Sequence, residues 1–309
     1  MIRYAFCAAM LVLIGECTAQ TPPPKPAIFE FHSGFWINLH QFLCHEAKVT
    51  DAAASDSQEW REAVDYYRRN VADRDVLSDE SAALNNRLSA AGSADDLPRD
   101  GFDAGVAAAL TKAAPVYRRV WWPQHNRSNR AWIDAVQPLL EKHGAAMQKD
   151  VVAAYGVTWP AAPIRTDVAA YAGPVGAYTT VDPAHITISS TDPHYGGNAA
   201  LEMLFHESSH TLDAKIRSAL TAELQAQGKL FRRRGFDHAI IFYTAGEIAR
   251  RYLPGYEPYG IRNGVLERGW AGSLEVLEKD WKPYLDGRTD LTAAVRAAVA
   301  DYGVARSAK

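Results

Sequence analysis

Cysteine is nearly absent from this chain, whose 309 residues contain only Cys7, Cys17 and Cys44. The first two fall inside an N-terminal stretch that reads as a cleaved export signal, so the mature chain would keep Cys44 alone. A single cysteine excludes an intramolecular disulfide. The folded chain must then be held together by its hydrophobic core or by a metal.

A large charge excess and a long hydrophobic run are also missing. The chain has 33 Lys and Arg against 36 Asp and Glu, a net charge of -3. This near balance gives no argument for a nucleic-acid partner, and the tightest basic run is the three arginines at 232–234. Beyond the N-terminal stretch no segment approaches the ~18 apolar residues of a transmembrane helix. We therefore expect a globular protein with no membrane span.

The first residues, "MIRYAFCAAMLVLIGECTAQ", predict export. A basic start precedes an apolar stretch, and Ala19 ends a small-residue cleavage site. We expect residues 1–19 to be a signal peptide, residues 20–29 a Pro-rich linker, and the mature protein to be periplasmic or extracellular. A lipid anchor at Cys17 is the alternative, although Glu16 stands where a small residue would be expected.

The apolar pattern divides the remaining chain into two regions. Residues 30–155 predict helices, because apolar side chains such as Trp60, Val64 and Tyr67 recur at helical spacing. From residue 156 the pattern changes to short β-branched or aromatic runs separated by Gly and Pro, which is typical of a small antiparallel sheet. These runs are 163–171, 176–181 and 185–190. A helix beginning near Asn198 and further helices follow, so the predicted class is α+β and mostly helical.

The stretch "FHESSHTLD", residues 205–213, carries two histidines four positions apart. On a helix this spacing places His206 and His210 about 40° apart around the axis and ~6 Å along it, so both imidazoles can bind one ion. Glu207 is rotated by about 100° from His206, which suits a general base beside a water that zinc activates. The sequence therefore predicts one Zn²⁺ per chain, bound on this helix.

The segment "MLFHESSHTL" resembles the zinc-binding helix of the HExxH metallopeptidases, and "HITISS" before it is similar to the substrate-aligning edge strand of that group. Within the group, gluzincins take a third ligand from a glutamate on a later helix, and "FYTAGEIAR", residues 242–250, resembles that segment. The resemblance spans about residues 185–250. It implies that His206, His210 and Glu247 bind zinc and that Glu207 is the general base, within a metallopeptidase-like region at 156–309.

The residues alone leave the third ligand open between Glu247, His238 and Asp213. His238 lies nine residues before Glu247, which is 900° on a regular helix, so the two point to opposite faces. Both can reach one ion only if the helix breaks between them. Asp213, three residues after His210, also suits a hydrogen bond to a ligand histidine.

The predicted function is an exported zinc metallopeptidase that acts on a peptide or protein substrate. Such an enzyme needs a donor for the developing oxyanion, and His238 or Tyr259 is the expected catalytic residue, ahead of Tyr243 and Tyr256. The alternative is a non-catalytic zinc-binding envelope protein, which a fourth protein ligand or a salt bridge to Glu207 would favour. A di-iron carboxylate enzyme needs a second Glu-x-x-His pair, and the sequence contains none.

Overall fold

The computed structural model describes residues 27–49, 57–98, 100–173 and 176–306. The predicted signal peptide, most of the linker and Cys17 lie outside these ranges. No helix within them is both long and apolar enough to cross a membrane. The elements are mostly helices with a small four-stranded sheet, which confirms the predicted α+β class.

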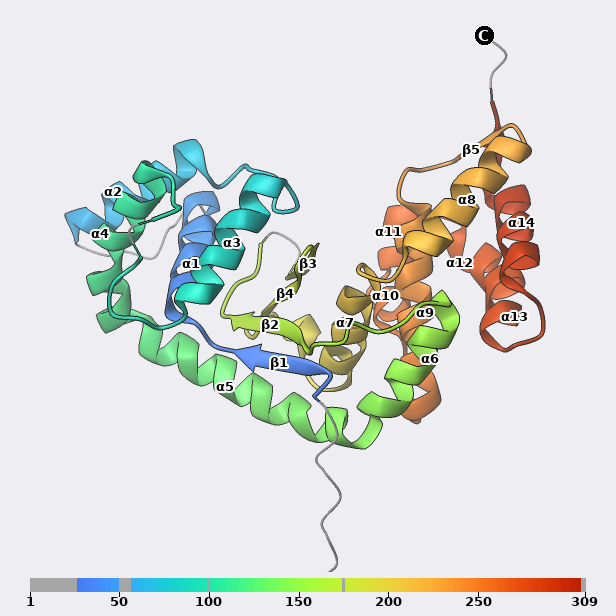
Figure 1. Ribbon diagram of the computed structural model, residues 1–309, viewed down its shortest axis with the longest axis horizontal. Helices are drawn as coiled ribbons and strands as arrows, with labels where there is room; N and C mark the ends of the chain where they lie inside the picture. Colours follow the sequence, from blue (N-terminus) through green and yellow to red (C-terminus); the bar gives the residue numbers. More distant parts are fainter. Residues whose placement is uncertain (1–26, 50–56, 99, 174–175, 307–309) are drawn as a thin grey trace, which may run out of the picture.

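Four helices form a lobe at the N-terminal side of the molecule, which we call the N-terminal lobe (Figure 1). They are α1 (Phe35–Lys48), α2 (Gln58–Asn70), α3 (Asp79–Ala91) and α4 (Ala104–Val120). The predicted helical spacing is confirmed, because Trp60, Val64 and Tyr67 are all buried in the core of this lobe. Ser57 and Ser78 cap α2 and α3 by accepting backbone N–H groups, which fixes where these helices begin.

Helix α5 (Trp122–Leu139) runs from the N-terminal lobe past the sheet (Figure 1). Pro138 lies near the end of α5, and a π-helical turn, η1 (Leu140–Gly144), follows it and leads into α6 (Ala145–Tyr155). Both α5 and α6 contribute to a second hydrophobic core, together with the sheet and the C-terminal helices. The division between the two cores therefore falls near the start of α5.

The main sheet has the strand order β1-β2-β4-β3. The strands are β1 (Phe29–His32), β2 (Ile164–Ala169), β3 (Ala177–Val181) and β4 (Ala184–Ser189). β1 and β4 lie parallel to β2, and only β3 runs antiparallel to its neighbour β4. The sheet is thus mixed rather than wholly antiparallel, because the whole N-terminal lobe is inserted between β1 and β2. The run "HITISS" forms the interior strand β4, and the edge strands of this sheet are β1 and β3.

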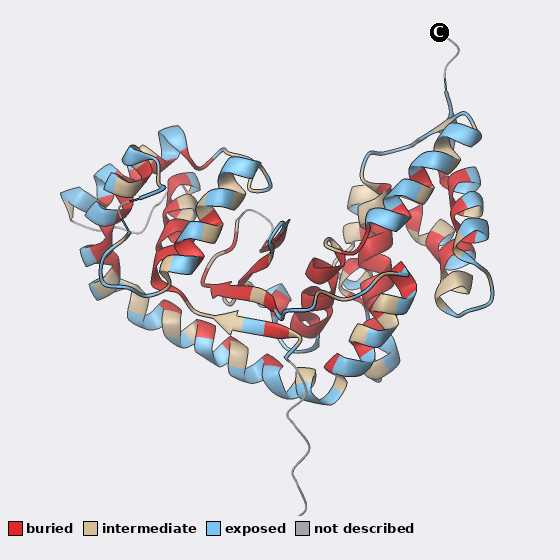
Figure 2. Ribbon diagram, viewed as in Figure 1, coloured by how far each residue is buried: buried red, intermediate tan, exposed pale blue. Residues whose placement is uncertain are grey.

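The chain after the sheet is helical, and helix α7 (Asn198–Ser209) begins at the residue that the sequence predicts. Figure 2 shows α7 and α9 as largely buried. The elements around α7 are η2 (Pro193–Tyr195), α8 (Ala214–Ala226), β5 (Lys229–Phe231), α9 (Phe236–Tyr252), α10 (Tyr259–Arg262), α11 (Val265–Trp270), α12 (Ser273–Val276), η3 (Leu277–Trp281), α13 (Lys282–Leu285), α14 (Leu291–Tyr302) and β6 (Gly303–Ala305). β5 and β6 pair as a separate antiparallel ribbon.

Candidate metal centre

Helix α7, which has His210 as its C-cap residue, carries His206 and Glu207 in the interior of the molecule. Gly197 precedes it with φ 56°, a left-handed conformation that favours glycine. The turn before it is held by the Trp132 indole, whose Nε1 donates to the Tyr195 carbonyl at 2.6 Å. Every residue from Ala199 to Ser209 is buried. The polar side chains of this helix therefore lie in surroundings of low polarity.

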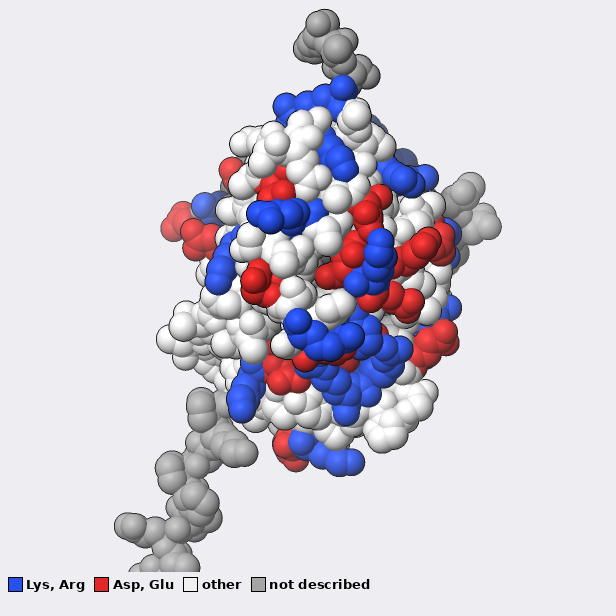
Figure 3. All heavy atoms as spheres, turned by 90° about the vertical axis from the view of Figure 1, so that its right-hand side faces the viewer, with Lys and Arg blue, Asp and Glu red and all other residues white. Residues whose placement is uncertain are grey.

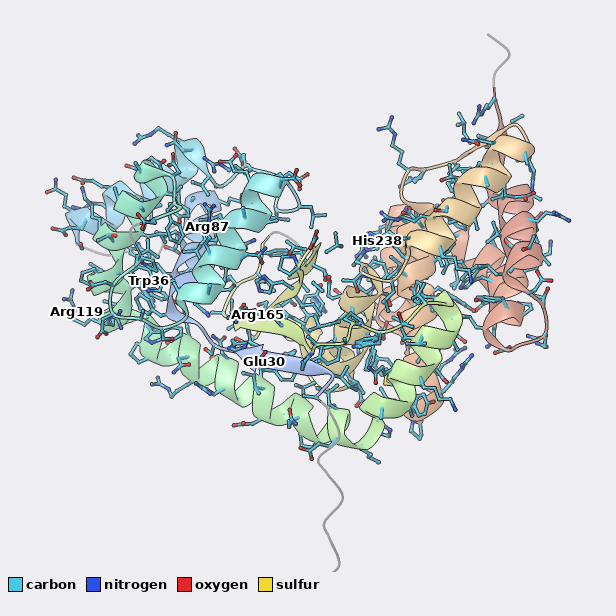
Figure 4. All side chains as sticks on the ribbon, viewed as in Figure 1. Glu30, Trp36, Arg87, Arg119, Arg165 and His238 are labelled. Atoms are coloured by element: carbon cyan, nitrogen blue, oxygen red, sulfur yellow. The ribbon has the colours of Figure 1, made fainter. Side chains whose placement is uncertain are left out.

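Three imidazoles converge at the end of α7. The ligand atoms of His206, His210 and His238 all lie within 4.8 Å of one another. His238 stands in the first turn of α9, on the side of the C-terminal helices that faces the sheet (Figure 4). The Nε2 atoms of His206 and His238 are 3.3 Å apart. Tetrahedral zinc with Zn–N bonds of ~2.0–2.1 Å places its nitrogen ligands about 3.4 Å apart, so the distance between His206 and His238 fits this ion.

The electrostatics of the three histidines also suit a metal. All three histidines have a lowered pKa, and burial is the largest cause in each case. The pKa of His210 falls to about 3, the pKa of His206 falls well below its usual value, and the pKa of His238 is also lowered. The imidazoles are therefore neutral near pH 7, which is the form that binds metal ions. The Phe242 ring centroid lies 3.9 Å from that of His206 and restricts solvent at the group.

Glu247, the third ligand that the resemblance implies, does not join this group. Its carboxylate accepts hydrogen bonds from Arg250 Nη2 at 2.6 Å and from Lys282 Nζ at 3.0 Å. Helix α9 runs without a break from Phe236 to Tyr252, so His238 and Glu247 face opposite sides, and the side with His238 packs toward α7. Among the described residues, His238 therefore takes the place predicted for Glu247.

A signal in the sequence could have favoured His238. On a helix it shares a face with Phe242, Ala245 and Ala249, and small residues of this kind allow a second helix to approach closely. Arg250 lies one turn after Glu247 and offers that carboxylate a partner. Asp213, the other alternative, is also outside the group, with its Oδ1 3.1 Å from Arg217 Nε.

The surroundings of Glu247 are a network of opposite charges. Around Lys282, Arg251 pairs with Asp150 at 3.1 Å, and Arg288 pairs with Asp286 at 2.9 Å. Figure 3 shows Lys and Arg next to Asp and Glu on the face that the C-terminal helices present. This interleaving indicates a structural role for the Glu247 carboxylate, which joins α9 to α13.

Glu207 lies buried beside the histidines and is held by strand β3. The Thr179 hydroxyl is 2.7 Å from Glu207 Oε2 and 2.9 Å from the Glu207 carbonyl oxygen. Burial raises the pKa of Glu207 to about 7, and the hydrogen bond from Thr179 opposes part of this rise. A carboxyl group with a pKa near the working pH is suited to accept and release a proton.

A cleft of about 350 Å³ opens between the N-terminal lobe and the α7–α8 segment, and Glu207 and His210 both line it. Residues 177–181 of β3, the edge strand, also line it, and residues 177–180 are buried. At its rims stand Leu77 and Val181, each 60% exposed. The general-base candidate and one metal-ligand candidate thus line a groove that follows an edge strand.

Tyr259, one of the predicted oxyanion donors, lies against a tyrosine that the sequence did not single out. The rings of Tyr195 and Tyr259 stack with centroids 5.4 Å apart, and their hydroxyl oxygens are 3.5 Å apart. Burial, Tyr259 and the Glu207 carboxylate raise the pKa of Tyr195, so this phenol stays protonated. The one signal in the sequence was the position of Tyr195 just before the two glycines that precede α7.

The other predicted donors have different surroundings. His238 lies among the metal-ligand candidates. The Tyr256 hydroxyl donates to Glu202 Oε2 at 2.6 Å. Tyr243 lies one turn before Glu247, and this carboxylate is among the causes that raise the Tyr243 pKa, after burial. Tyr195 and Tyr259 therefore remain as the candidate donors.

Glu202 ties helix α7 to the loop that carries Tyr259. Glu202 Oε2 accepts from the Tyr259 backbone N–H at 2.9 Å, in addition to the Tyr256 hydroxyl. Gly246 allows this close packing, because an added Cβ would lie 2.6 Å from Pro258 Cβ and 3.2 Å from Glu202 Oε1. Glu202 stands one turn before His206, so it couples the position of Tyr259 to the metal-ligand helix.

The ionisation of Glu202 predicts a pH dependence of stability. Burial raises its pKa from 4.5 to about 7, so the folded chain keeps a proton that the unfolded chain loses. This contribution is fully present below pH 4.5 and is lost as the pH rises toward 7. We expect the free energy of unfolding to change between pH 4.5 and 7.5 by about 3 kcal/mol less in Glu202→Gln than in the native chain. Urea unfolding of both metal-free chains at pH 4.5 and 7.5 measures it, and equal dependence in the two would contradict the shift.

A second buried cluster has the residue types of a nucleophilic triad but lacks its geometry. Asp167 Oδ2 lies 2.7 Å from His185 Nε2, and Ser89 Oγ lies 3.4 Å from the same nitrogen. A triad needs the acid and the nucleophile on opposite nitrogens of the imidazole. Asp167 also accepts from Arg165 Nε at 2.8 Å, so the cluster joins β2 and β4 to the N-terminal lobe.

No family model, curated protein or solved structure matches this chain. The functional assignment therefore rests on the motif, the geometry of the histidine group and the cleft beside it.

Proposed function

We propose that this chain is an exported zinc-dependent peptidase that binds its metal through His206, His210 and His238. The observation that carries the proposal is the position of Glu207 and His210 on a cleft that follows the edge strand β3. An extended peptide can add to such an edge through backbone hydrogen bonds. The peptide bond would then lie beside both the metal-ligand group and the general base.

Each residue of the site has a distinct role in this proposal. A zinc ion held by three imidazoles supplies Lewis-acid activation of water and of a carbonyl group. Glu207 accepts the proton of the attacking water on its carboxylate, and Thr179 orients that carboxylate through its hydroxyl. Tyr195 or Tyr259 donates a hydrogen bond to the developing oxyanion.

Two observations favour catalysis over a non-catalytic zinc site. Among the described residues the metal-ligand group has three members, which leaves one coordination position for substrate or water. The hydrogen-bond donor at the Glu207 carboxylate is the neutral hydroxyl of Thr179, and no Lys or Arg in the described ranges forms an ion pair with it. Both features are those expected of an open site.

The proposal is tested by metal removal and reloading. We expect the chelated chain to be inactive toward a permanently unfolded protein and to regain activity at one equivalent of Zn²⁺ per chain. Mass spectrometry of the fragments measures cleavage, and metal analysis after gel filtration measures binding. A chain that binds one zinc and cleaves no peptide bond would favour the non-catalytic alternative instead.

A further inference from the structure

The rims of the cleft carry the two most exposed large hydrophobic side chains of the described residues. Leu77 and Val181 are each 60% exposed. Leu77 belongs to the segment before α3 in the N-terminal lobe, and Val181 ends β3, so they come from separate parts of the chain. Both line the same cleft as Glu207 and His210. Exposed apolar side chains on both sides of one groove indicate a contact surface for an apolar ligand group.

Each of these apolar residues has a carboxylate close by in the chain. Asp79 and Asp182 are exposed, line the same cleft, and form no ion pair within the described ranges. The adjacent acid Glu80, in contrast, pairs with Arg74 at 2.5 Å. Two carboxylates without a cationic partner, one on each rim, favour a positively charged group between them.

The remaining charges of the cleft do not neutralise this pair. Arg217 is the one Lys or Arg that lines the cleft among the described residues, and it lies 3.1 Å from the Asp213 carboxylate. Asp213 and Arg217 therefore balance each other, and Asp79 and Asp182 are the exposed charges of the cleft that form no ion pair in the described ranges. Without a bound metal ion the groove is thus negatively charged, although the whole chain is near balance.

We infer that the cleft binds an extended peptide segment in which an apolar side chain stands next to a Lys or Arg. Leu77 and Val181 contact the apolar side chain, Asp79 and Asp182 bind the cation, and the backbone lies along β3. The edge strand favours a peptide over a small organic cation, because β3 pairs with a strand on one side only and an extended backbone can add to its other side. That the bound peptide is also cleaved rests on the proposed function.

Binding can be measured apart from cleavage with the zinc-loaded Glu207→Gln chain. The probes are three labelled ten-residue peptides that differ at one position, with Leu-Lys, Leu-Gln or Leu-Glu at the centre, and fluorescence anisotropy reports binding. We expect the Lys peptide to bind most tightly at low ionic strength. Replacing either Asp79 or Asp182 with Asn is expected to lower the affinity for the Lys peptide by about fivefold. Leu77→Ser and Val181→Ser are expected to lower the affinity for all three peptides by the same factor.

Asp73→Asn is the matched control, because Asp73 is an exposed acid of the N-terminal lobe that does not line the cleft. It should leave the order of the three peptides unchanged, and thermal melting should show every variant folded. Equal binding of the three peptides, or binding of none, overturns the inference. If the Lys peptide binds best and the zinc-loaded native chain cleaves none of the three, the inference on binding stands and the proposed function fails.

Discussion

Replacing Glu207 with Gln is expected to lower kcat for peptide hydrolysis by about a thousandfold, the middle of the range for loss of a general base. The amide has the shape of the carboxylate and can still accept the Thr179 hydroxyl, so the local structure should hold. Zinc should stay bound at one per chain, because Glu207 is outside the histidine group. Steady-state kinetics and metal analysis of the same preparation measure both outcomes. Activity close to that of the native chain would contradict the assigned role.

Thr179→Val tests the same general base by a smaller change, because it removes only the hydroxyl that binds the Glu207 carboxylate. The Thr179 hydroxyl opposes the rise that burial causes in the pKa of Glu207. Removing it should raise that pKa, and because a general base works deprotonated, the acid limb of the pH–rate profile should move to higher pH. A lower rate with an unmoved limb would point to a loss of position alone.

Replacing His238 with Ala is expected to weaken zinc binding by more than about a hundredfold, since even residues that only support a ligand cost 10–100-fold. Glu247→Ala on the same helix is the matched control. Its carboxylate binds Arg250 and Lys282, so the variant should keep zinc and lose about 2 kcal/mol of unfolding free energy. Competition with a zinc chelator and urea unfolding separate the two effects. The reverse result, with zinc lost only in Glu247→Ala, would restore the ligand that the resemblance implies.

The sequence identified the parts of the site that depend on local spacing. The four-residue interval between His206 and His210 fixes their relation on any regular helix, and the helix begins at Asn198 as predicted. The two histidines therefore lie in one group that could hold a metal ion, as their spacing predicts. Tyr259 stays a predicted oxyanion donor, which the sequence proposed because it lies near Glu247 in the chain.

Other parts of the fold depend on segments far apart in the chain. β1 joins β2 across an insertion of the entire N-terminal lobe, so a short run at the end of a Pro-rich stretch becomes part of a mixed sheet. Likewise β3, rather than β4, is the edge strand, because β4 pairs with β2 on its other side. Neither pairing leaves a pattern within the strand itself that distinguishes it from the alternatives.

The sequence by itself determined that His206, Glu207 and His210 lie together at the end of one helix, where the two imidazoles can bind one metal ion. Only the tertiary structure decided that His238 completes the group and that Glu247 binds Lys282. Helical spacing placed these two residues on opposite faces of α9 but could not say which face meets α7. That choice depends on the packing of the whole C-terminal core, where the small residues of one face allow close contact and the carboxylate of the other reaches its cationic partners.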